Sequence, residues 1–366
     1  MRNTQINIFV DCHIFDKNYQ GTTTYIKGIY QEFILDKDKH FFLAASNINH
    51  LKTVFGVHSN VTYLPLQSTN KFVRLFLEIP RLIRKYKIDY AHFQYITPPI
   101  KACKYIVTIH DVLFLEYPHF FPWLYRIKNY LLFKRSAKQA DIVCTVSPFS
   151  KEKIKHFFNV NSIITPNAVD PVFYEKYDKK SVQELVKKQF GQEQYWIYVS
   201  RWEPRKNHLN LVKVFAENEH YKEYSLLFIG DQDIPNKSFD AYYDCLPNEI
   251  KSKIHIKNKV SFQDMLLLLR GATLSVYPSF AEGFGIPPLE SVAAQIQTVC
   301  SNTTAMADFD FLNGFFFNPE DVVEMNQVIT HALATPFPTD SILKLQQNYN
   351  WQIAAKKIEE ALLKAQ

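Results

Sequence analysis

The stretch that decides the fold is TLSVYPSFAEGFGIPPLE, residues 273–290. Its first five residues are mostly apolar or β-branched and predict a buried strand. A loop with Gly283 and Gly285 follows. Pro287 and Pro288 then suit the first turn of a helix, where a missing N–H leaves no hydrogen bond unmade. A strand that passes through a glycine turn into a helix is the repeating unit of an α/β domain.

The same alternation of short apolar runs and longer helical stretches extends along the chain. Strands are expected in the first half at 6–10, 41–45, 61–66, 90–93, 105–109, 141–146 and 162–165, and in the second half at 195–199, 225–229, 254–256, 273–277 and 298–300. Helices are expected between them, for example at 25–35, 72–86, 124–138 and 262–270. This order predicts parallel sheets that are covered by helices on both faces.

Two domains are expected, because the strand series restarts near residue 190 after a polar, lysine-rich segment. A length of 366 residues also favours two domains. We therefore expect an α/β protein with two Rossmann-like, doubly wound domains that face a central cleft. Their predicted limits are 1–180 and 181–345, and a C-terminal helix at 346–366 is expected to pack back toward the first domain. Ligands bind at the carboxyl ends of the strands in such sheets.

Charge is divided unevenly between the two halves. Residues 1–180 hold 25 Lys or Arg and 14 Asp or Glu, whereas residues 181–366 hold 17 and 22. A basic half beside an acidic half indicates an anionic partner, such as nucleic acid, a phospholipid surface or a pyrophosphate-linked acceptor. No nucleic-acid recognition motif accompanies the charge, so no nucleic-acid partner is expected.

The cysteines and the N-terminus bear on the expected compartment. The five cysteines are odd in number and form no CxxC pair, which predicts neither a disulfide framework nor a zinc site. Reduced thiols fit a cytosolic protein. The chain runs from Met1 into a strand without a signal-peptide pattern, and no run of 18 apolar residues occurs. A cytoplasmic location is therefore expected.

The turn at 279–290 is the first segment that indicates chemistry. Its helix start offers free N–H groups and partial positive charge to a phosphate, and its glycines let a ligand approach the backbone. Glu282 and Glu290 frame the turn. Their carboxylates suit sugar and ribose hydroxyls, because carboxylates accept hydrogen bonds. The alternative is a structural turn whose glutamates serve the helix dipole.

The second such segment is YVSRWEPRKNH, residues 198–208, where another expected strand ends. Arg201, Arg205 and Lys206 cluster there, ahead of an expected helix at 209–215. Arginine makes bidentate contacts to phosphate and lysine adds a mobile point charge. Positive charge of this kind stabilises a departing diphosphate. A solvated basic loop is the alternative interpretation.

The EGFGIPPLE segment, the RWEPRKN loop and the downstream Asn350-Trp351 pair together resemble the retaining glycosyltransferases of family 4, which have the GT-B fold. The resemblance covers nearly the whole chain and is strongest over 195–302. It implies that Arg201 and Lys206 bind the diphosphate of a nucleotide-sugar donor. It places Glu290 at the nucleotide ribose and Glu282 at the hydroxyls of the transferred sugar. The donor is also expected to touch the backbone of Gly283, Phe284 and Gly285.

Looser matches to the family lie in the first half. Gly21 takes the place of a flexible glycine loop near donor and acceptor, although the family carries more glycine there. His110-Asp111 resembles a His-Asp element of the family, which implies that His110 faces the reacting sugar. Ordinary loop hydrogen bonding is the alternative for this histidine. The chain departs from the family at 303–309, where many members carry a glutamate and this chain reads TTAMADF.

The string Asp231-Gln232-Asp233 has the D-x-D form that holds a divalent metal in other glycosyltransferases. We interpret it as a turn between strand and helix, because the cationic loop already supplies the charge that a metal would. No metal and no other cofactor is expected, and the nucleotide-diphosphate sugar is the donor substrate.

Two basic, apolar segments raise the question of a membrane. Residues 70–87 read NKFVRLFLEIPRLIRKYK, with six basic residues and one acidic residue, and residues 118–135 have a similar character. Such segments suit the surface of an anionic bilayer. They equally suit helices that cover a domain with snorkelling Lys and Arg side chains. Peripheral contact with the inner face of the membrane is thus one of two open interpretations.

The expected function is a retaining transfer of a hexose from a nucleotide-diphosphate sugar. Its acceptor is a glycan or a lipid-linked saccharide in surface polysaccharide biosynthesis, and His110 and Glu282 are the catalytic candidates. The proline-containing EGFGIPPLE form favours mannose from a GDP-mannose-like donor. Two alternatives stay open, namely a sugar-nucleotide epimerase on the same fold and a non-catalytic sugar-nucleotide-binding subunit.

Overall fold

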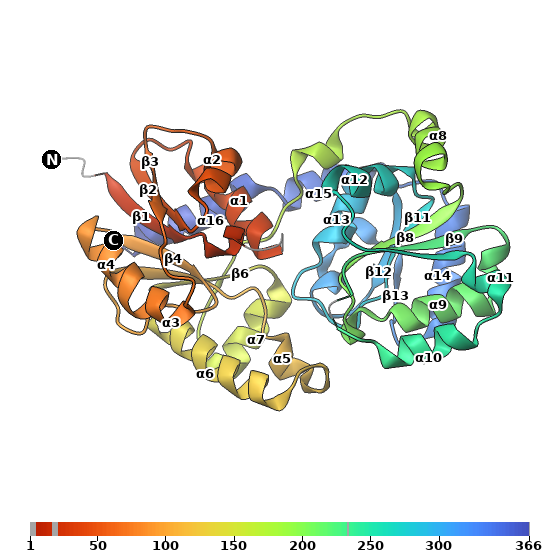
Figure 1. Ribbon diagram of the computed structural model, residues 1–366, viewed down its shortest axis with the longest axis horizontal. Coiled ribbons are helices and arrows are strands. Elements are labelled where there is room, and N and C mark those ends of the chain that lie inside the picture. Colours follow the sequence, from red (N-terminus) through yellow and green to blue (C-terminus); the bar gives the residue numbers. More distant parts are fainter. Residues whose placement is uncertain (1–4, 17–20, 233, 366) are drawn as a thin grey trace. The chain divides into compact units, whose positions relative to one another are not determined.

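The structure is a computed structural model that describes residues 5–16, 21–232 and 234–365. Its contacts divide the chain into two compact units, Met1–Ala168 with Tyr349–Gln366 and Val169–Asn348. Each unit is built on one parallel sheet with helices around it (Figure 1). The predicted α/β class with two doubly wound domains is confirmed. The domain limits expected from the sequence and the cleft between the domains stay predictions.

The first unit holds a seven-stranded sheet in the order β3-β2-β1-β4-β5-β6-β7. All its neighbouring strands are parallel, and Ile8, for example, pairs with Phe41 on one side and Tyr90 on the other. The central strands are largely buried on both faces, which explains why most of their residues are apolar. The strands are β1 (Ile6–Asp11), β2 (Lys39–Ala45), β3 (Val61–Pro65), β4 (Tyr90–Gln94), β5 (Lys104–Thr108), β6 (Ile142–Thr145) and β7 (Ile163–Ile164).

The helices of the first unit lie between these strands, with one addition from the end of the chain. They are η1 (His13–Asp16), α1 (Gly21–Phe33), α2 (Ile48–Phe55), α3 (Lys71–Val73), the π-helical turn η2 (Arg74–Glu78), α4 (Ile79–Lys85), α5 (Leu113–Glu116), η3 (Pro118–Phe120), α6 (Trp123–Gln139), α7 (Pro148–Phe158) and α16 (Trp351–Lys364). The helix expected at 72–86 therefore contains a π-helical turn, a feature found often at functional sites.

Helix α16 packs on α1 through a close approach of one glycine. An ideal Cβ at Gly28 would lie 2.1 Å from Cδ2 of Trp351, so no larger residue fits there. Tyr25 meets the same indole edge to face, with ring centroids 6.3 Å apart. Asn350 begins the helix by accepting a hydrogen bond from the backbone N–H of Ile353 at 2.9 Å. The Asn350-Trp351 pair thus attaches the last helix to the first unit.

The second unit holds a six-stranded parallel sheet in the order β10-β9-β8-β11-β12-β13. Its strands are β8 (Tyr195–Val199), β9 (Ser225–Ile229), β10 (Ile254–Lys257), β11 (Leu274–Tyr277), β12 (Gln297–Ser301) and β13 (Phe316–Phe317). Five of these strands were expected from the sequence. Strand β13, of two residues, was not.

The helices of the second unit include the predicted segments around 209–215 and 262–270. They are η4 (Pro171–Tyr174), α8 (Lys179–Phe190), η5 (Pro204–Lys206), α9 (His208–Glu217), η6 (His220–Lys222), α10 (Lys237–Cys245), α11 (Asn248–Lys251), α12 (Phe262–Gly271), α13 (Ile286–Ala293), η7 (Thr304–Asp308), η8 (Asp310–Leu312), α14 (Val322–Ala334) and α15 (Asp340–Asn348). Across the part of the chain that the structure describes, no helix is both long and apolar enough to cross a bilayer.

Strand order reverses once in each sheet, between β1 and β4 in the first and between β8 and β11 in the second. Ligands of doubly wound sheets bind outside the carboxyl ends of the strands at this reversal. The topology therefore points to two places. One follows Asp11 and Gln94 in the first unit, and the other follows Val199 and Tyr277 in the second.

Candidate functional site

The two motif loops of the second unit follow β8 and β11 and are bound to each other. The backbone N–H of Phe280 donates to the carbonyl of Arg205 at 2.8 Å. The side chain of Asn207 donates to the carbonyl of Pro278 at 3.0 Å. Asn207 has a φ of 58°, a left-handed conformation in which asparagine is several-fold enriched. The reversal of strand order thus brings the RWEPRKN and EGFGIPPLE segments side by side.

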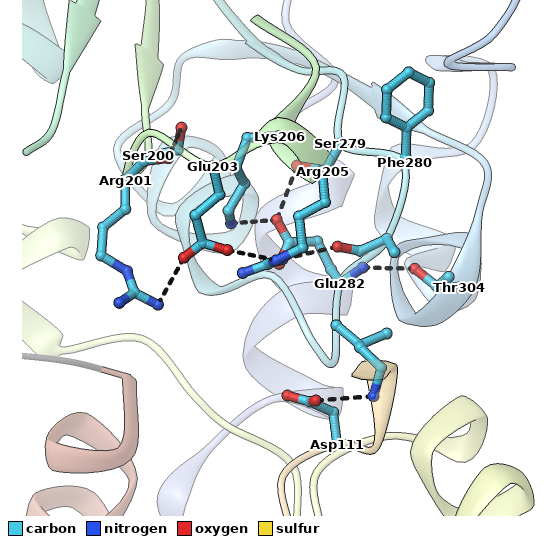
Figure 2. Close-up of polar contacts among 12 residues, drawn as sticks. Asp111, Ser200, Arg201, Glu203, Arg205, Lys206, Ser279, Phe280, Glu282 and Thr304 are labelled. Atoms are coloured by element: carbon cyan, nitrogen blue, oxygen red, sulfur yellow. Dashed lines mark hydrogen bonds and ion pairs between the residues drawn. The ribbon is translucent and has the colours of Figure 1, made fainter. Parts of the chain in front are cut away.

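A carboxylate held by two cations lies at the centre of this site (Figure 2). Lys206 Nζ contacts Glu282 Oε1 at 2.5 Å, and Arg205 Nη1 contacts Glu282 Oε2 at 2.9 Å. The hydroxyl of Ser279 donates to Oε1 at 2.8 Å. Both carboxylate oxygens therefore accept hydrogen bonds, and the side chain of Glu282 is fixed before any ligand binds.

A second carboxylate extends the network to Arg201. Glu203 Oε2 accepts from Arg205 Nε at 2.6 Å, and Glu203 Oε1 lies 3.1 Å from Arg201 Nη2. The Arg201 side chain is 53% exposed, whereas those of Arg205 and Lys206 are 12% and 14% exposed. Arg201 is therefore the most exposed of these three cations. Of the three, it is the one that an anion from solvent can contact most readily.

Electrostatics keep Glu282 ionised. Burial by itself would raise the pKa of this carboxyl, but the positive charges of Lys206 and Arg205 outweigh it and lower the pKa to about 2. Burial in turn lowers the pKa of Lys206, and the attraction of Glu282 opposes that effect. Because the two side chains are hydrogen-bonded to each other, we regard both Lys206 and Glu282 as charged at neutral pH.

The segment that departs from the family pattern supports the backbone of this turn. Thr304 Oγ1 accepts a hydrogen bond from the backbone N–H of Glu282 at 2.9 Å. Thr304 adopts a φ of 54°, which is uncommon for a β-branched residue. Sequence reasoning did not anticipate this role for Thr304.

The start of α13 is shaped by Gly285, whose φ of +100° favours glycine. A Cβ there would also lie 3.1 Å from Cγ of Met306. Pro287 and Pro288 carry no N–H. Among the described residues, the N–H groups of Gly285 and Ile286 have no hydrogen-bond partner. They form the part of the helix start that is open to an anion.

Glu290 lies in the second turn of α13, because the helix begins at Ile286. Within the described chain its carboxyl group has no hydrogen-bond partner. Burial and the nearby charge of Asp170 raise the pKa of Glu290 to about 7. A half-buried carboxyl group without a hydrogen-bond partner can accept hydrogen bonds from ribose hydroxyls.

Two predicted site residues belong to the first unit. Gly21 is exposed and is the first residue of α1. His110 follows β5 and is buried, with its Nε2 2.5 Å from Oε1 of Gln94. The ring of Tyr25 packs edge to face against it at 5.0 Å. Burial lowers the pKa of His110 to about 3, so its imidazole is neutral at physiological pH.

The structure therefore groups the catalytic candidate and the donor-binding candidates of the second unit on two adjoining loops and the helix that follows. They are Arg201, Lys206, Glu282, Gly283, Phe284, Gly285 and Glu290. Phe284 is buried and its ring packs edge to face on Phe309 at 5.7 Å. The assigned roles of these residues, and those of Gly21 and His110, stay predictions.

The D-x-D string is only partly described, because Asp233 lies outside the described residues. The carboxylate of Asp231 accepts a hydrogen bond from the backbone N–H of Lys259 at 3.0 Å. It thereby ties the loop after β9 to the loop after β10.

Sequence reasoning missed three supporting side chains, Glu203, Arg205 and Ser279, as site residues. Arg205 was noted as part of the basic cluster but was not assigned a role. A signal was available, because Glu203 and Arg205 stand inside the RWEPRKN motif and Ser279 lies three residues before Glu282. The contact of Arg205 with Glu282, however, joins residues 77 positions apart, which spacing along the chain does not reveal.

Comparisons with known proteins agree with this geometry. Residues 181–363 match the family model described as "Glycosyl transferases group 1", and residues 40–173 match "Glycosyltransferase Family 4". The O-antigen chain mannosyltransferase B of Escherichia coli is 26% identical over 258 residues, which cover 67% of this chain and 66% of that protein. The O-antigen chain mannosyltransferase RfbU of Salmonella typhimurium is 28% identical over 233 residues, which cover 63% and 61%. The chain thus spans less than two thirds of either relative.

A solved structure shows the same fold. Anabaena HepE in complex with UDP-glucose superposes with a TM-score of 0.72 at 15% sequence identity, covering 98% of this chain and 99% of that one. The likeness in fold extends over both units and confirms the expected GT-B class.

Proposed function

Since this chain belongs to the glycosyl transferases group 1, we propose that it transfers a hexose from a nucleotide-diphosphate sugar with retention of configuration. The acceptor is a glycan or a lipid-linked saccharide in surface polysaccharide biosynthesis. The names of two relatives, both O-antigen mannosyltransferases, support mannose as the transferred sugar. A GDP-mannose-like donor is part of the proposal. We place the reaction in the cytoplasm, where nucleotide sugars are available.

The observation that carries the proposal is the Glu282 carboxylate, held by Lys206 and Arg205 beside the open N–H groups at the start of α13. In the proposed complex the diphosphate contacts Arg201, Lys206 and these N–H groups. An ammonium has three donors, so Lys206 can keep Glu282 while it also binds phosphate. Glu282 accepts hydrogen bonds from the sugar hydroxyls, and Glu290 accepts them from the ribose.

The proposed reaction needs no protein base. The bond between the anomeric carbon and the diphosphate oxygen breaks, and the leaving electron pair is stabilised by the cations. The acceptor hydroxyl forms its bond to the anomeric carbon on the same face, and its proton passes to a phosphate oxygen. His110 takes part as a neutral imidazole: Nε2 is engaged by Gln94, which leaves Nδ1 for a hydrogen bond to the sugar.

A thermal-shift panel of UDP-, GDP-, ADP- and dTDP-sugars tests the donor site. We expect one nucleotide class to raise the melting temperature, and expect Lys206→Ala and Glu290→Ala each to abolish that shift. Lys344→Ala is a matched control, because Lys344 is exposed on α15 of the same unit. If both site variants respond to the donor as the wild type does, the donor is bound elsewhere.

Incubation with the donor alone separates transfer from the alternatives. An epimerase would produce a new nucleotide sugar without any acceptor, which NMR of the sugar would detect. A non-catalytic subunit would bind the donor and yet transfer to none of the offered acceptors. We expect an acceptor-dependent product with the anomeric configuration of the donor.

We further propose that the first unit lies on an anionic membrane surface through one face, termed here the apolar-basic face. Its exposed apolar side chains are Phe72, Val73, Phe76 and Leu77 before α4, and Trp123, Leu124, Tyr125, Ile127 and Leu131 on α6. The two segments are neighbours, because Arg74 and Phe133 line one cavity. The same helices carry Lys71, Arg81, Arg84, Lys85, Arg126, Lys128 and Lys134. Apolar area with surrounding positive charge suits anionic lipid.

Vesicle sedimentation tests this contact. We expect binding to vesicles with phosphatidylglycerol, weaker binding to pure phosphatidylcholine, and loss of binding in the pair Phe72→Ser with Trp123→Ser. The control pair is Val323→Ser with Leu343→Ser, which removes exposed apolar side chains from the second unit. Equal binding by both pairs would show that the apolar-basic face is not the membrane contact.

A further inference from the structure

We propose that Glu203 is a specificity-determining residue that competes with the phosphates of the ligand for Arg201. It thereby weakens binding of the departing nucleoside diphosphate more than binding of the nucleotide-diphosphate sugar. The identity of these two ligands rests on the proposed function. The contact of the Glu203 carboxylate with the arginines of the RWEPRKN loop does not.

Glu203 lies between two arginines of that loop (Figure 2). Its Oε1 lies 3.1 Å from Arg201 Nη2, and its Oε2 accepts a hydrogen bond from Arg205 Nε at 2.6 Å. Its side chain is 14% exposed. Guanidinium groups bind carboxylate and phosphate oxygens with the same geometry. The Glu203 carboxylate therefore makes the kind of contact that an incoming phosphate would make.

The backbone turn that follows Glu203 does not depend on its carboxylate. The carbonyl of Glu203 accepts a hydrogen bond from the backbone N–H of Lys206 at 2.9 Å, which closes the turn η5. The side chain of Glu203, however, makes no capping hydrogen bond to that turn. Pro204 stands at the first position of the turn, where its fixed φ is suitable. The carboxylate thus serves the cations rather than the local fold.

The carboxylates of Glu203 and Glu282 differ in the cations that they contact. Glu282 contacts Lys206 and Arg205, whereas Glu203 contacts Arg205 and Arg201. Arg205 therefore bridges the two carboxylates, and Arg201 is paired with Glu203. These three cations and two carboxylates together leave a single positive charge. Loss of the Glu203 charge would double the positive charge that the site presents to an anion.

A fixed negative charge at this place acts most strongly on the ligand with the most negative charge. The diphosphate of the proposed donor contacts Arg201, so it would share one guanidinium with Glu203. The two anions would then lie within the Debye length of about 8 Å, where like charges repel. A free nucleoside diphosphate carries more negative charge than its sugar ester, because its terminal phosphate loses a second proton with a pKa of about 6.

This difference in affinity favours turnover. Cations that stabilise a departing diphosphate also hold it after the reaction, and product release limits the rate of many enzymes. A carboxylate beside Arg201 lowers that retention. Lys206 and the N–H groups at the start of α13 remain available to the departing charge. Glu203 thus limits inhibition by the product.

Isothermal titration calorimetry of the full chain with GDP, GDP-mannose and inorganic pyrophosphate tests the inference. Glu203→Gln removes the charge and keeps the size of the side chain and one acceptor oxygen. We expect GDP to bind this variant about tenfold more tightly than the wild type at low salt, and GDP-mannose only a few-fold more tightly. Both gains should shrink at high salt, which screens the charge of Glu203.

Two further variants separate the charge of Glu203 from its position. Glu203→Asp keeps the charge on a shorter side chain, so GDP should bind it nearly as it binds the wild type. Glu249→Gln removes an exposed carboxylate from α11 of the same unit and should leave GDP binding unchanged. A gain in Glu203→Asp as large as that in Glu203→Gln would overturn the inference, because the charge would then not be the cause.

The remaining outcomes distinguish this inference from the proposed function. Tighter binding of GDP to Glu203→Gln, with a smaller gain for GDP-mannose, supports the inference. Weaker or unchanged GDP binding overturns it, because Glu203 would then position the arginines or have no effect. Equal gains for the two nucleotides also overturn it. If neither nucleotide binds the wild type, the proposed donor fails, and pyrophosphate decides: tighter binding to Glu203→Gln supports competition by Glu203, and equal or weaker binding overturns it.

Discussion

Single side chains at the donor-site candidate are held by charge. Glu282, Lys206 and Arg205 are nearly buried, and each makes direct contact with an opposite charge. Removing one partner of such a pair leaves an uncompensated charge in a poorly solvated place. The arrangement is therefore more sensitive to substitution than surface ion pairs are.

We predict that Lys206→Met lowers the free energy of unfolding by about 3 kcal/mol, because Glu282 loses its nearer cation. Urea unfolding at neutral pH measures this change. Lys344→Met is the control: that lysine pairs with Asp340 at 3.2 Å on an exposed helix, and such pairs contribute less than about 1 kcal/mol. Equal losses of unfolding free energy in the two variants would show that burial does not strengthen the effect of removing a lysine from an ion pair.

We predict that the stability difference between Glu290→Gln and the wild type depends on pH. The pKa of Glu290 is about 7 in the folded chain, against an ordinary value of 4.5 for a glutamate in the unfolded chain. The folded wild type therefore binds more protons than the unfolded chain between these values, and its stability falls as pH rises through that window. Glu290→Gln has no titrating group at this position, so its stability does not show this fall. From pH 5 to pH 8 it should gain about 2 kcal/mol relative to the wild type.

Urea unfolding at the two pH values checks this prediction, with the exposed Glu249→Gln as the control. A relative stability of Glu290→Gln that stays the same at both values would show that this carboxyl is ionised in the folded chain at pH 5.

At the scale of single residues, the sequence predicted those site residues that lie close together within one motif. Lys206 and Glu282 were both identified, but as two separate contacts to a ligand, whereas the structure joins them directly. The cavity of the first unit was not predicted. Its residues Asp11, Thr23, Arg74 and Gln94 come from four segments that are far apart in the sequence, and none of these four residues was singled out.

Elements were predicted well where buried strands and amphipathic helices are long enough to show a period. The interruption of 72–86 by the π-helical turn η2 was not foreseen, because one extra residue in a turn barely changes the apolar spacing. The residues through which α16 packs on α1 could not be predicted, since the contact joins Gly28 to a tryptophan more than 300 residues away.

We predict that Gly285→Ala destabilises the chain by about 2–3 kcal/mol, through a left-handed backbone and the contact with Met306 at 3.1 Å. Gly191→Ala separates the two causes. Gly191 has a φ of +69° at the end of α8, with no neighbour within 4 Å of its Cβ position, so only the backbone cost of about 1 kcal/mol applies. Calorimetry of both variants measures the two losses of stability. Equal losses would show that the contact with Met306 does not contribute.

At the scale of the whole molecule, each sheet reverses its strand order once, and a cavity lies at the first reversal and the donor-site candidate at the second. The alternation of strands and helices was sufficient to predict two such sheets. We also expected from the sequence that a C-terminal helix packs toward the first domain. The residues that make the contact were not predicted; in the structure, Tyr349–Gln366 belongs to the unit whose other residues end at Ala168.

We predict that deletion of residues 349–366 weakens the first unit and spares the second. Helix α16 contacts α1, β6 and β7, so hydrogen exchange should become faster in those three elements. Exchange in β8, β9 and β11 should stay as in the full chain. Faster exchange in the second unit alone would contradict the division of the chain into these two units.

The same division has a consequence for synthesis on the ribosome. Domains generally complete in the order in which they are made, from the N-terminus onward. Here the earlier-made sheet must wait, with the Gly28 surface uncovered, until Trp351 leaves the exit tunnel, whereas residues 169–348 have all emerged by then. The unit that is begun second can therefore be completed first.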